Sequence, residues 1–300
     1  MNNNDYVVLI NKPINMTSFK VTGAVKRKLG IKKAGHAGTL DPMATGVLPV
    51  MTGRATRLID MISIDRKRYK ARFMLGMTTD TLDYEGQVLT EQPVLCDKTD
   101  IENAVNGFIG EITQIPPMYS ALKKDGVKLY ELARKGIEIE RKSRKITIDK
   151  INVTSIDEYE DTFICEIDVI CSKGTYIRTL IDDIGVKLGC GAYMTSLERT
   201  SSNGFDIESC VSLDEFLNSD NPLSLCKQPD FAIMDFKSVT VSENQSKRFR
   251  NGGELFIDRI KPKLDKTALG EKFRVYCADT NEFIGVGIIK DDLLCPICVF

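Results

Sequence analysis

The segment HAGTLDPMATGVLP, which runs from His36 to Pro49, displays one acidic side chain, Asp41, among small and apolar residues. Pro42 has no backbone N–H and biases Asp41 away from the α region, so the pair predicts a stiff, extended turn that presents the carboxylate. Gly38 and Gly46 permit positive φ or close approach to a bulky ligand. These residues leave two interpretations open, because Asp-Pro also starts many turns that are only structural.

Composition indicates a globular protein with an ample core. The chain has 300 residues, 42% of them hydrophobic, enough for one large domain or a large and a small one. No apolar run approaches the roughly 20 residues of a membrane span, and the polar start Met1 to Asp5 lacks the regions of a signal peptide. We therefore expect a cytoplasmic protein that does not enter a membrane.

The cysteines are not arranged like a disulfide framework. There are nine, an odd number, scattered along a chain of this length, which favours reduced thiols. Cys295 and Cys298 have CxxC spacing, but the chain holds no second CxxC and one histidine, so a zinc site lacks ligands. We expect no metal site, and interpret this pair as packing residues.

The net charge of -1 conceals an uneven distribution. Residues 1–150 carry 25 Lys and Arg against 17 Asp and Glu, whereas residues 151–300 carry 16 against 25. The first half contains the basic runs 26–28, 32–33, 66–72 and 141–145. Basic runs beside the Asp41 segment favour a polyanionic partner whose phosphates supply affinity.

Apolar periodicity predicts strands and helices without regular βαβ alternation. We expect strands over 6–10, 69–75, 137–151 and 163–171, and helices over 17–29, 54–62 and 175–188. A capping box formed by Thr99 and Glu102 predicts a short helix to Asn106. The pattern is typical of an α+β fold with a mainly antiparallel mixed sheet. The polar run 218–222 suggests a boundary, with one domain over 1–225 and a small β-rich domain over 226–300.

Several segments together are similar to one known family. Besides 36–49, they are KRYKA (67–71), DTLD (80–83), PPMYSALK (116–123), KLYELAR (128–134) and CSKGTYIR (171–178). From about Lys12 to Phe205 the chain resembles the TruB-type tRNA pseudouridine synthases, with these motifs in the family's order. The resemblance implies that Asp41 is the catalytic aspartate, that Tyr69 stacks on the target uracil and that Arg178 pairs with Asp41. It assigns His36, Tyr176 and Leu197 to substrate binding.

The resemblance also implies a fold and an activity. The fold would be a pseudouridine synthase catalytic domain followed by a PUA-like RNA-binding domain. The reaction would convert uridine 55 in the T-loop of tRNA to pseudouridine. It would use a flipped base and a nucleophilic carboxylate, which a neighbouring guanidinium favours in its ionised form. No cofactor or metal is implied, tRNA is the partner, and we expect a monomer that needs no protein partner.

Three other functions can be weighed on the residues. A non-catalytic RNA-binding protein of the same fold would be expected to lose Asp41, Tyr69 or Arg178, and all three are present. Phosphoryl transfer through a phospho-aspartate would require a second carboxylate at position 43, which is Met43. A guide-RNA-dependent synthase would share the catalytic core; the compact length and lack of basic tails favour a stand-alone enzyme, by analogy alone.

The sequence departs from the family pattern at three positions. Asn15 replaces a usual glycine, and Asn tolerates the same left-handed backbone. Tyr193 stands where His is common, and Glu198 where Arg is usual. We expect the last two changes to remove positive charge near the pocket and to affect phosphate contacts rather than the catalytic groups.

Overall fold

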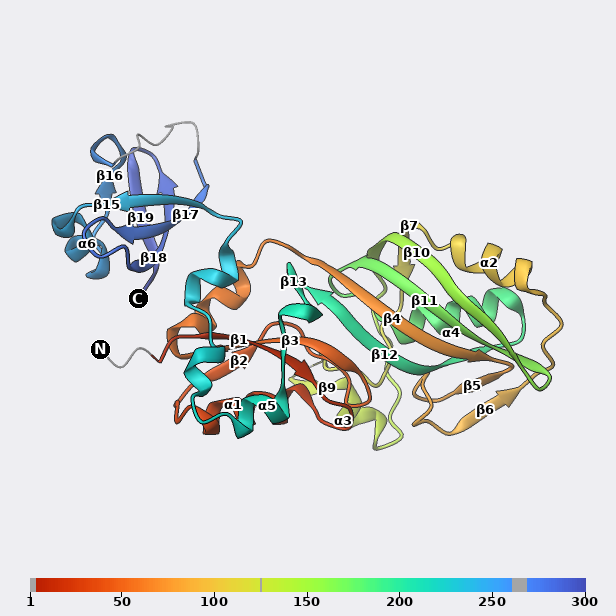
Figure 1. Cartoon of the computed structure of the whole chain (residues 1–300). Helices are drawn as coiled ribbons and strands as arrows, with labels where there is room; N and C mark the ends of the chain where they lie inside the picture. The colour runs from red at the N-terminus through yellow and green to blue at the C-terminus, as the bar shows by residue number, and fades with distance from the viewer. Residues whose placement is uncertain (1–3, 125, 261–268) are drawn as a thin grey trace.

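The computed structural model describes residues 4–124, 126–260 and 269–300, and two β-sheets dominate this part of the chain (Figure 1). The larger sheet has ten strands in the order β14-β1-β3-β12-β4-β11-β10-β7, with β2 beside β3 and β13 beside β12. Its strands are β1 (Val7–Lys12), β2 (Ala34–His36), β3 (Thr45–Thr52), β4 (Arg66–Leu75), β7 (Gly110–Gln114), β10 (Arg144–Tyr159), β11 (Thr162–Ser172), β12 (Ala192–Ser202), β13 (Phe205–Asp206) and β14 (Val211–Ser212).

The pairing of these strands confirms the predicted α+β class with a mainly antiparallel, mixed sheet. The pairs β1–β14 and β12–β3 are parallel, and the other pairs described in this sheet are antiparallel. The β12–β3 pair is short, because its register joins Glu198 to Thr45 and Arg199 to Gly46. The segment that contains Asp41 leads directly into β3, so it lies where β3 meets β12.

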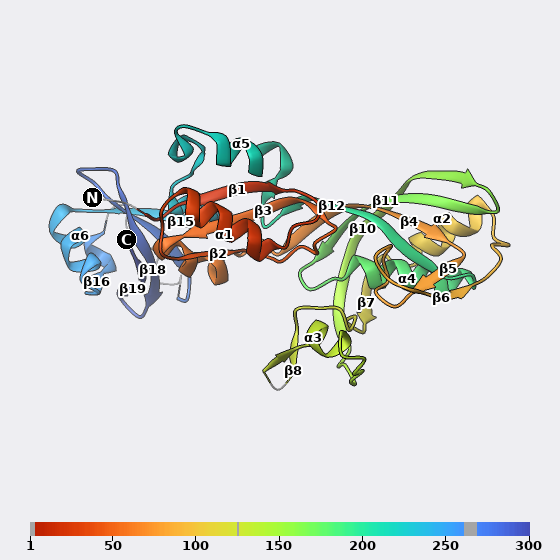
Figure 2. The ribbon, with the colours of Figure 1, turned by 90° about the horizontal axis from the view of Figure 1, so that it is seen from below.

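Helices cover the sheet near both of its ends (Figures 1 and 2). Helix α4 (Ile177–Leu188) packs on β12 and on α2 (Lys98–Asn106), and its Leu180 and Ile184 enter a core that also contains Phe73 of β4. Helix α1 (Ser18–Lys28) and helix α5 (Leu213–Asn218) lie beside β1 and β3. Apolar cores therefore lie between the sheet and each group of helices, one with Leu180 of α4 and another with Val21 of α1.

The remaining elements are short. They are η1 (Gly53–Met61), β5 (Met77–Thr79), β6 (Val88–Glu91), β8 (Lys123–Lys124), β9 (Val127–Lys128), α3 (Leu129–Ala133), η2 (Ile207–Ser209), η3 (Pro222–Leu225) and η4 (Pro229–Ile233). The segment with β8 and α3 projects away from the large sheet (Figure 2). It carries part of the basic charge of the first half of the chain.

Three local predictions were wrong in detail. The strand expected over 137–151 begins only at Arg144 and continues to Tyr159. Residues 53–61 form a 3₁₀ helix, not an α-helix. The Gly53 carbonyl accepts a hydrogen bond from the Thr56 hydroxyl at 2.8 Å, whereas in an α-helix it would accept one from a backbone N–H four residues later. Helix α2 begins earlier than Thr99 and Glu102 suggested. Its capping box is formed by Asp97 and Asp100, because an aspartate reaches the third helical N–H as well as a threonine does.

The predicted helix after Thr17 is confirmed. The Thr17 hydroxyl accepts a hydrogen bond from the Lys20 N–H at 3.2 Å, and Gly30 follows the last turn with φ of 65°. Asn15, just before the helix, has φ of 63°, so it adopts the left-handed conformation that we expected it to tolerate.

A second sheet occupies the C-terminal part of the chain. Its order is β15-β17-β18-β19-β16, and helix α6 packs on it. The bounds are β15 (Lys237–Val241), α6 (Glu243–Arg250), β16 (Leu255–Phe256), η5 (Ile257–Arg259), β17 (Lys272–Cys277), β18 (Phe283–Lys290) and β19 (Leu293–Val299). The sheet confirms a small β-rich unit, while the boundary between residues 225 and 226 stays a prediction.

The cysteines are free, as expected from their spacing. All nine lie in the described part of the chain and none forms a disulfide. Cys295 and Cys298 lie in β19 and are buried, and the Cys298 side chain packs in the core that contains Val7 of β1. In the part of the chain that the structure describes, no helix is both long and apolar enough to cross a membrane.

Gly46 provides a test of the junction between β3 and β12. Its φ is 105°, and a Cβ atom there would lie 2.2 Å from the Arg199 carbonyl oxygen. We expect Gly46→Ala to lower the free energy of unfolding by more than the ~1–2 kcal/mol of a left-handed alanine alone, because backbone atoms cannot move aside cheaply.

The matched control is Gly30→Ala, because Gly30 also has positive φ but has no atom within 4 Å of its Cβ position. Urea denaturation of both variants measures the difference. Equal losses of stability would contradict the close approach of β3 and β12 at Gly46.

Candidate active site

The Asp41 segment forms the predicted turn. The Ala44 N–H donates to the Asp41 carbonyl at 3.1 Å, which closes a four-residue turn with Pro42 at its second position. The Asp41 side chain is 34% exposed, so its carboxylate can be reached from solvent.

Two buried cationic side chains donate hydrogen bonds to carbonyl oxygens of this segment and fix its backbone. The Lys12 ammonium, on a residue with no exposed surface, donates to the carbonyl of Pro42 at 3.1 Å and to those of residues 13 and 16. The Arg199 guanidinium, equally buried, donates to the carbonyl of Gly38 at 2.8 Å and to that of Val47 at 2.7 Å. The turn that carries Asp41 is thereby fixed at both of its ends.

Sequence reasoning assigned no role to either cation. The pKa of Lys12 is lowered to about 8, chiefly by burial, and the Asp41 charge opposes the shift. The sequence nevertheless contains an indication of buried positions. Lys12 directly follows the strand-forming run VVLIN, and Arg199 comes two residues after Leu197, so these two side chains point to the same face of a strand.

Ser18 also fixes the Asp41 segment. Its hydroxyl donates to the Leu40 carbonyl at 3.1 Å and accepts from the Leu40 N–H at 2.9 Å.

Arg178 joins the Asp41 turn to two other segments. Its Nε lies 2.9 Å from Asp41 Oδ2, its Nη1 donates to the Thr81 carbonyl at 2.9 Å, and its Nη2 donates to the Tyr119 carbonyl at 2.8 Å. Asp83 Oδ2 lies 3.6 Å from Nη1. The Arg178 side chain is 5% exposed, so the pair with Asp41 is half buried. The guanidinium therefore gives its hydrogen bonds to two backbone carbonyls, and its contact with Asp41 is an ion pair through one nitrogen rather than a bidentate one.

Asp83 is a second carboxylate at this guanidinium. Burial raises its pKa, while hydrogen bonds from the Thr81 hydroxyl at 2.6 Å and the Glu85 N–H at 3.1 Å oppose the shift. The sequence placed Asp83 in a motif without giving it a role. The structure shows it ordering residues 81–85 around Arg178.

A cavity of about 180 Å³ opens beside the Asp41 carboxylate. It brings together five of the six residues assigned from the sequence, Asp41, Tyr69, Tyr176, Arg178 and Leu197. The remaining lining residues are Thr39, Leu40, Lys67, Ser120, Ala121, Gly174, Thr175 and Ile177. Among the residues that the structure describes, Asp41 is the one carboxylate in this wall. One acid therefore faces a chamber that combines aromatic and aliphatic side chains with two cations and several hydroxyl groups.

The aromatic residues of the cavity are held by defined contacts. Tyr69 lies on β4, is 6% exposed, and has a pKa raised by burial, which the nearby Arg199 guanidinium opposes. The Tyr176 backbone donates to and accepts from the Gln114 side-chain amide, at 3.1 and 3.2 Å. The Arg144 guanidinium lies over the Tyr176 ring, 4.6 Å from its centroid. Gln114 and Arg144 position Tyr176 and were not identified from the sequence.

His36, the sixth assigned residue, does not line the cavity. Its Nδ1 lies 3.1 Å from the Thr22 hydroxyl and its Nε2 lies 3.2 Å from the hydroxyl of Thr39, a residue of the cavity wall. Burial, and secondarily the Arg199 charge, lower the pKa of His36. These surroundings favour the neutral form of the ring, which contacts the cavity through the wall residue Thr39.

Strand β4 divides the basic run 66–72 between two faces of the sheet. Side chains alternate along a strand, and Lys67 and Tyr69 face the cavity, so Arg66, Arg68, Lys70 and Arg72 lie on the opposite face. There Arg68 Nε donates to Asp168 Oδ1 at 2.8 Å. Within this run, only Lys67 brings positive charge to the cavity.

The two charge departures from the family pattern fall outside the cavity. Glu198 lies between Leu197 and Arg199 on β12 and pairs in register with Lys70 of β4, so it belongs to the far face of the sheet. The Tyr193 hydroxyl donates to the Met74 sulfur at 3.2 Å, and Tyr193 does not line the cavity. Neither departure therefore changes the charge of the cavity wall itself, and the expected effect on phosphate contacts stays a prediction.

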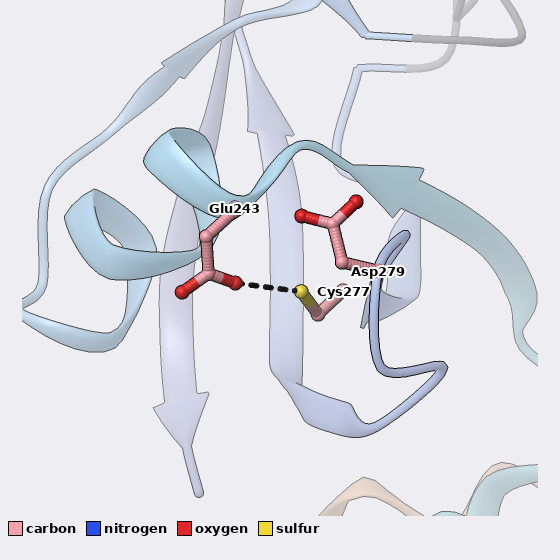
Figure 3. Close-up of side chains that lie close together, drawn as sticks. All are labelled: Glu243, Cys277 and Asp279. Carbon is pink, nitrogen blue, oxygen red and sulfur yellow. Dashed lines mark hydrogen bonds between the residues drawn. The ribbon is translucent and has the colours of Figure 1, made fainter.

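A group of side chains of the kinds that bind metals lies where helix α6 meets the end of β17. Glu243, Cys277 and Asp279 each offer one ligand atom, and these atoms lie within 4.8 Å of one another (Figure 3). The Cys277 thiol donates to Glu243 Oε2 at 3.2 Å, so this pair is satisfied without an ion. We assign no metal to the group.

Comparison with known proteins identifies the family. The model of the TruB family pseudouridylate synthase N-terminal domain matches residues 26–177. The tRNA pseudouridylate synthase B C-terminal domain matches residues 178–222, and the model "Pseudouridine synthase II TruB, C-terminal" matches residues 238–300. The chain belongs to the TruB family of pseudouridine synthases.

Relatives in the TruB family are similar over nearly the whole chain. A tRNA pseudouridine synthase B from Clostridium kluyveri is 46% identical, with 96% of both chains covered, and one from Clostridium perfringens strain 13 is 44% identical, with 94% of both covered. A solved chain titled "Crystal Structure of a Cbf5-Nop10-Gar1 Complex" has a TM-score of 0.70 and 25% identity, and covers 98% of this chain and 83% of that one.

A second solved chain agrees in fold. It comes from an H/ACA RNP bound to a substrate RNA containing 2'-deoxyuridine, with a TM-score of 0.71 and 22% identity over 98% of this chain and 84% of that one. Membership of the TruB family makes this protein an RNA pseudouridine synthase, an isomerase, as the motifs implied.

Arg178→Lys tests the junction at Arg178. A lysine cannot reach Asp41, Thr81 and Tyr119 together, so we expect pseudouridine formation to fall at least 100-fold. We also expect the free energy of unfolding to drop by about 1–3 kcal/mol for each buried carbonyl left without a donor. Single-turnover conversion and urea denaturation measure the two effects.

The control is Arg72→Lys, since Arg72 is exposed on the other face of β4 and should tolerate the exchange. An Arg178→Lys variant with normal turnover would show that the divided contacts of the guanidinium are dispensable.

His36→Gln tests the neutral histidine. Because the pKa of His36 is lowered in the folded state, the unfolded chain binds more protons as the pH falls toward and below 6.5, and stability is lost there. We expect the melting temperature of the wild type to fall more steeply than that of the variant between pH 7.5 and 5. His36 is the only histidine, so the difference between the two curves isolates it. Parallel curves would contradict burial of the ring.

Proposed function

We propose that this chain is a tRNA pseudouridine synthase that converts uridine 55 of the T-loop to pseudouridine, with Asp41 as the nucleophile. The observation that carries the proposal is the Asp41–Arg178 pair at the wall of a cavity that also contains Tyr69. The curated relatives quoted above are named as tRNA pseudouridine synthase B, which supports tRNA as the substrate.

The isomerisation balances without a redox partner. The bond between N1 of the uracil and C1′ of the ribose breaks, a bond from C5 to C1′ forms, C5 gives up a proton and N1 gains one. A carboxylate can assist by attacking either the ring or C1′, provided that it is ionised and oriented. Arg178 Nε lies 2.9 Å from Asp41 Oδ2 and holds the carboxylate at the cavity, and the buried cations beneath the turn fix the backbone that carries it.

The cavity supplies a place for the displaced base. A uracil within an RNA loop must leave its stack to reach Asp41, as other base-modifying enzymes require. We propose that Tyr69 stacks on the uracil while Leu197 and Tyr176 form the walls around it. His36 would act at the entrance through Thr39, whose hydroxyl it contacts and which lines the cavity.

The rest of the chain would bind the body of the tRNA. The excess of positive charge in residues 1–150 suits a phosphate backbone. We propose that residues 1–225 form the catalytic domain and that residues 226–300 form a PUA-like RNA-binding domain, with no cofactor required. We propose that the enzyme acts in the cytoplasm as a monomer without a protein partner.

Asp41→Asn tests the nucleophile. The amide keeps the shape of the side chain but is a much weaker nucleophile, so we expect conversion of a T-arm hairpin to fall by at least 1,000-fold while the dissociation constant for RNA changes less than about threefold. Nearest-neighbour mapping of the modified nucleotide identifies the position. The matched control is Asp60→Asn, because Asp60 is exposed and outside the cavity wall.

The outcomes separate two functions. Conversion at the T-loop uridine by the wild type and by Asp60→Asn, and not by Asp41→Asn, is the expected result. If the wild type binds the hairpin tightly but converts no uridine, the chain is an RNA-binding protein and the catalytic proposal is wrong. Conversion at another uridine would show that uridine 55 is not the target, but would leave the proposed reaction in place.

A further inference from the structure

Lys67 is the charged side chain of the cavity that the chemistry above leaves without a task. It lies on β4 two residues before Tyr69, so both side chains point to the same face of the sheet. The other basic residues of the run 66–72 lie on the opposite face, as described above. A single lysine has thus been placed at the edge of the base-binding chamber.

The Lys67 ammonium lies beside the Asp41 segment without an anionic partner. Its Nζ is 3.3 Å from the position that a Cβ on Gly38 would take, and Arg199 Nη1 is at the same distance from that position. Two cations therefore meet over the backbone of Gly38, where glycine leaves them room. In the described part of the chain, no hydrogen bond or ion pair of Lys67 is found, whereas Arg199 donates to several carbonyls.

The surroundings make this charge costly. Burial lowers the pKa of Lys67 to about 8, and the Arg199 and Lys173 charges act in the same direction. Cys171 and Asp65 act in the opposite direction and do not cancel the effect. A methionine would fill the same space without this cost. A charge kept in such a position is explained by an anion that arrives with the substrate.

The spacing along β4 identifies which anion fits. Two residues of a strand span about 7 Å, so the backbone of Lys67 is displaced by that length from the backbone of Tyr69. A uracil stacked on Tyr69 is joined to its phosphate through one ribose. The phosphate of the same nucleotide can therefore lie near the Lys67 ammonium while the base occupies the cavity.

We propose that Lys67 binds the phosphodiester group attached to the flipped uridine and so fixes the ribose relative to Asp41. This rests on the proposed function, since it needs an RNA whose base enters the cavity. Lys67 is a binding and positioning residue here and takes no part in proton transfer. The neighbouring guanidinium of Arg199 adds positive potential and remains bonded to the carbonyls of the Asp41 segment.

The test combines a variant with a modified RNA. A synthetic T-arm hairpin is prepared in three forms: unmodified, with a neutral methylphosphonate on the 5′ side of the target uridine, and with one on the 3′ side. Dissociation constants are measured for the wild type, for Lys67→Met and for the control Lys70→Met. Lys70 has the same charge on the same strand but lies on the far face of the sheet.

We expect Lys67→Met to weaken binding of the unmodified hairpin about tenfold, as is usual for a charge-assisted hydrogen bond. The slope of log K against log salt should fall by about one unit. One of the two methylphosphonates should weaken binding to the wild type and to Lys70→Met by a similar factor, and should have little further effect on Lys67→Met. That non-additivity identifies the contact.

Two measurements guard against a folding artefact. The melting temperature of Lys67→Met should equal or exceed that of the wild type, because an unpaired, largely buried charge is removed. Lys67→Arg keeps the charge and should recover part of the affinity and the sensitivity to the methylphosphonate. If Lys67→Met fails to fold, the same comparison with Lys67→Gln and Lys67→Arg decides the question.

Other results would overturn the proposal. Additive effects of Lys67→Met and both methylphosphonates would show that Lys67 does not contact either phosphate. Normal affinity with lost turnover, together with loss of a pH-dependent limb near 8, would assign Lys67 to proton transfer instead. If the wild type binds and converts the hairpin, but the effects of Lys67→Met and of each methylphosphonate on binding simply add, this contact alone is refuted. If the wild type does not bind the hairpin, the proposed function and this contact are refuted together.

Discussion

Burial of two cations beneath a single turn is the constraint on which the active site depends. Lys12 and Arg199 have no exposed surface, and carbonyl oxygens of residues 38–47 are among the acceptors of both. Removing an ammonium or guanidinium from water is expensive unless its donors are satisfied, so these carbonyls must stay where they are. The backbone around Asp41 is thus held by charge, and the aspartate side chain remains free to face the cavity.

Arg178 completes the site by joining segments that are distant in the sequence. It contacts Asp41 from the first fifty residues, the Thr81 carbonyl, and the Tyr119 carbonyl at the start of the segment that projects from the sheet. The helix that carries Arg178 is positioned by apolar packing of Leu180 and Ile184 in the core. The position of the Arg178 guanidinium therefore depends on apolar packing of its helix and on the hydrogen bonds that the guanidinium itself makes.

Much of this arrangement could be predicted from the sequence, and the exceptions have physical reasons. Asp41, Tyr69 and Arg178 were found because motifs are read along the chain, and the structure brings these side chains to one cavity. Local signals were less certain: the cap of α2 lies at Asp97, because several polar residues near a helix start compete for the same N–H groups. The roles of Lys12, Arg199 and Gln114 were missed, because each depends on carbonyl or amide groups contributed by other segments, which a sequence does not display.

The short junction between β3 and β12 has a consequence for how the enzyme becomes active during folding. Strands β14, β1 and β3 lie on one side of this junction, and β12, β4, β11, β10 and β7 lie on the other. Asp41 belongs to the first half, whereas Tyr69, Arg178 and Leu197 belong to the second. Neither half holds a complete site, so a partly folded chain that has formed only one of them has no catalytic constellation. The junction between β3 and β12 is therefore a requirement for activity as well as for stability, because it is where the two parts of the site meet.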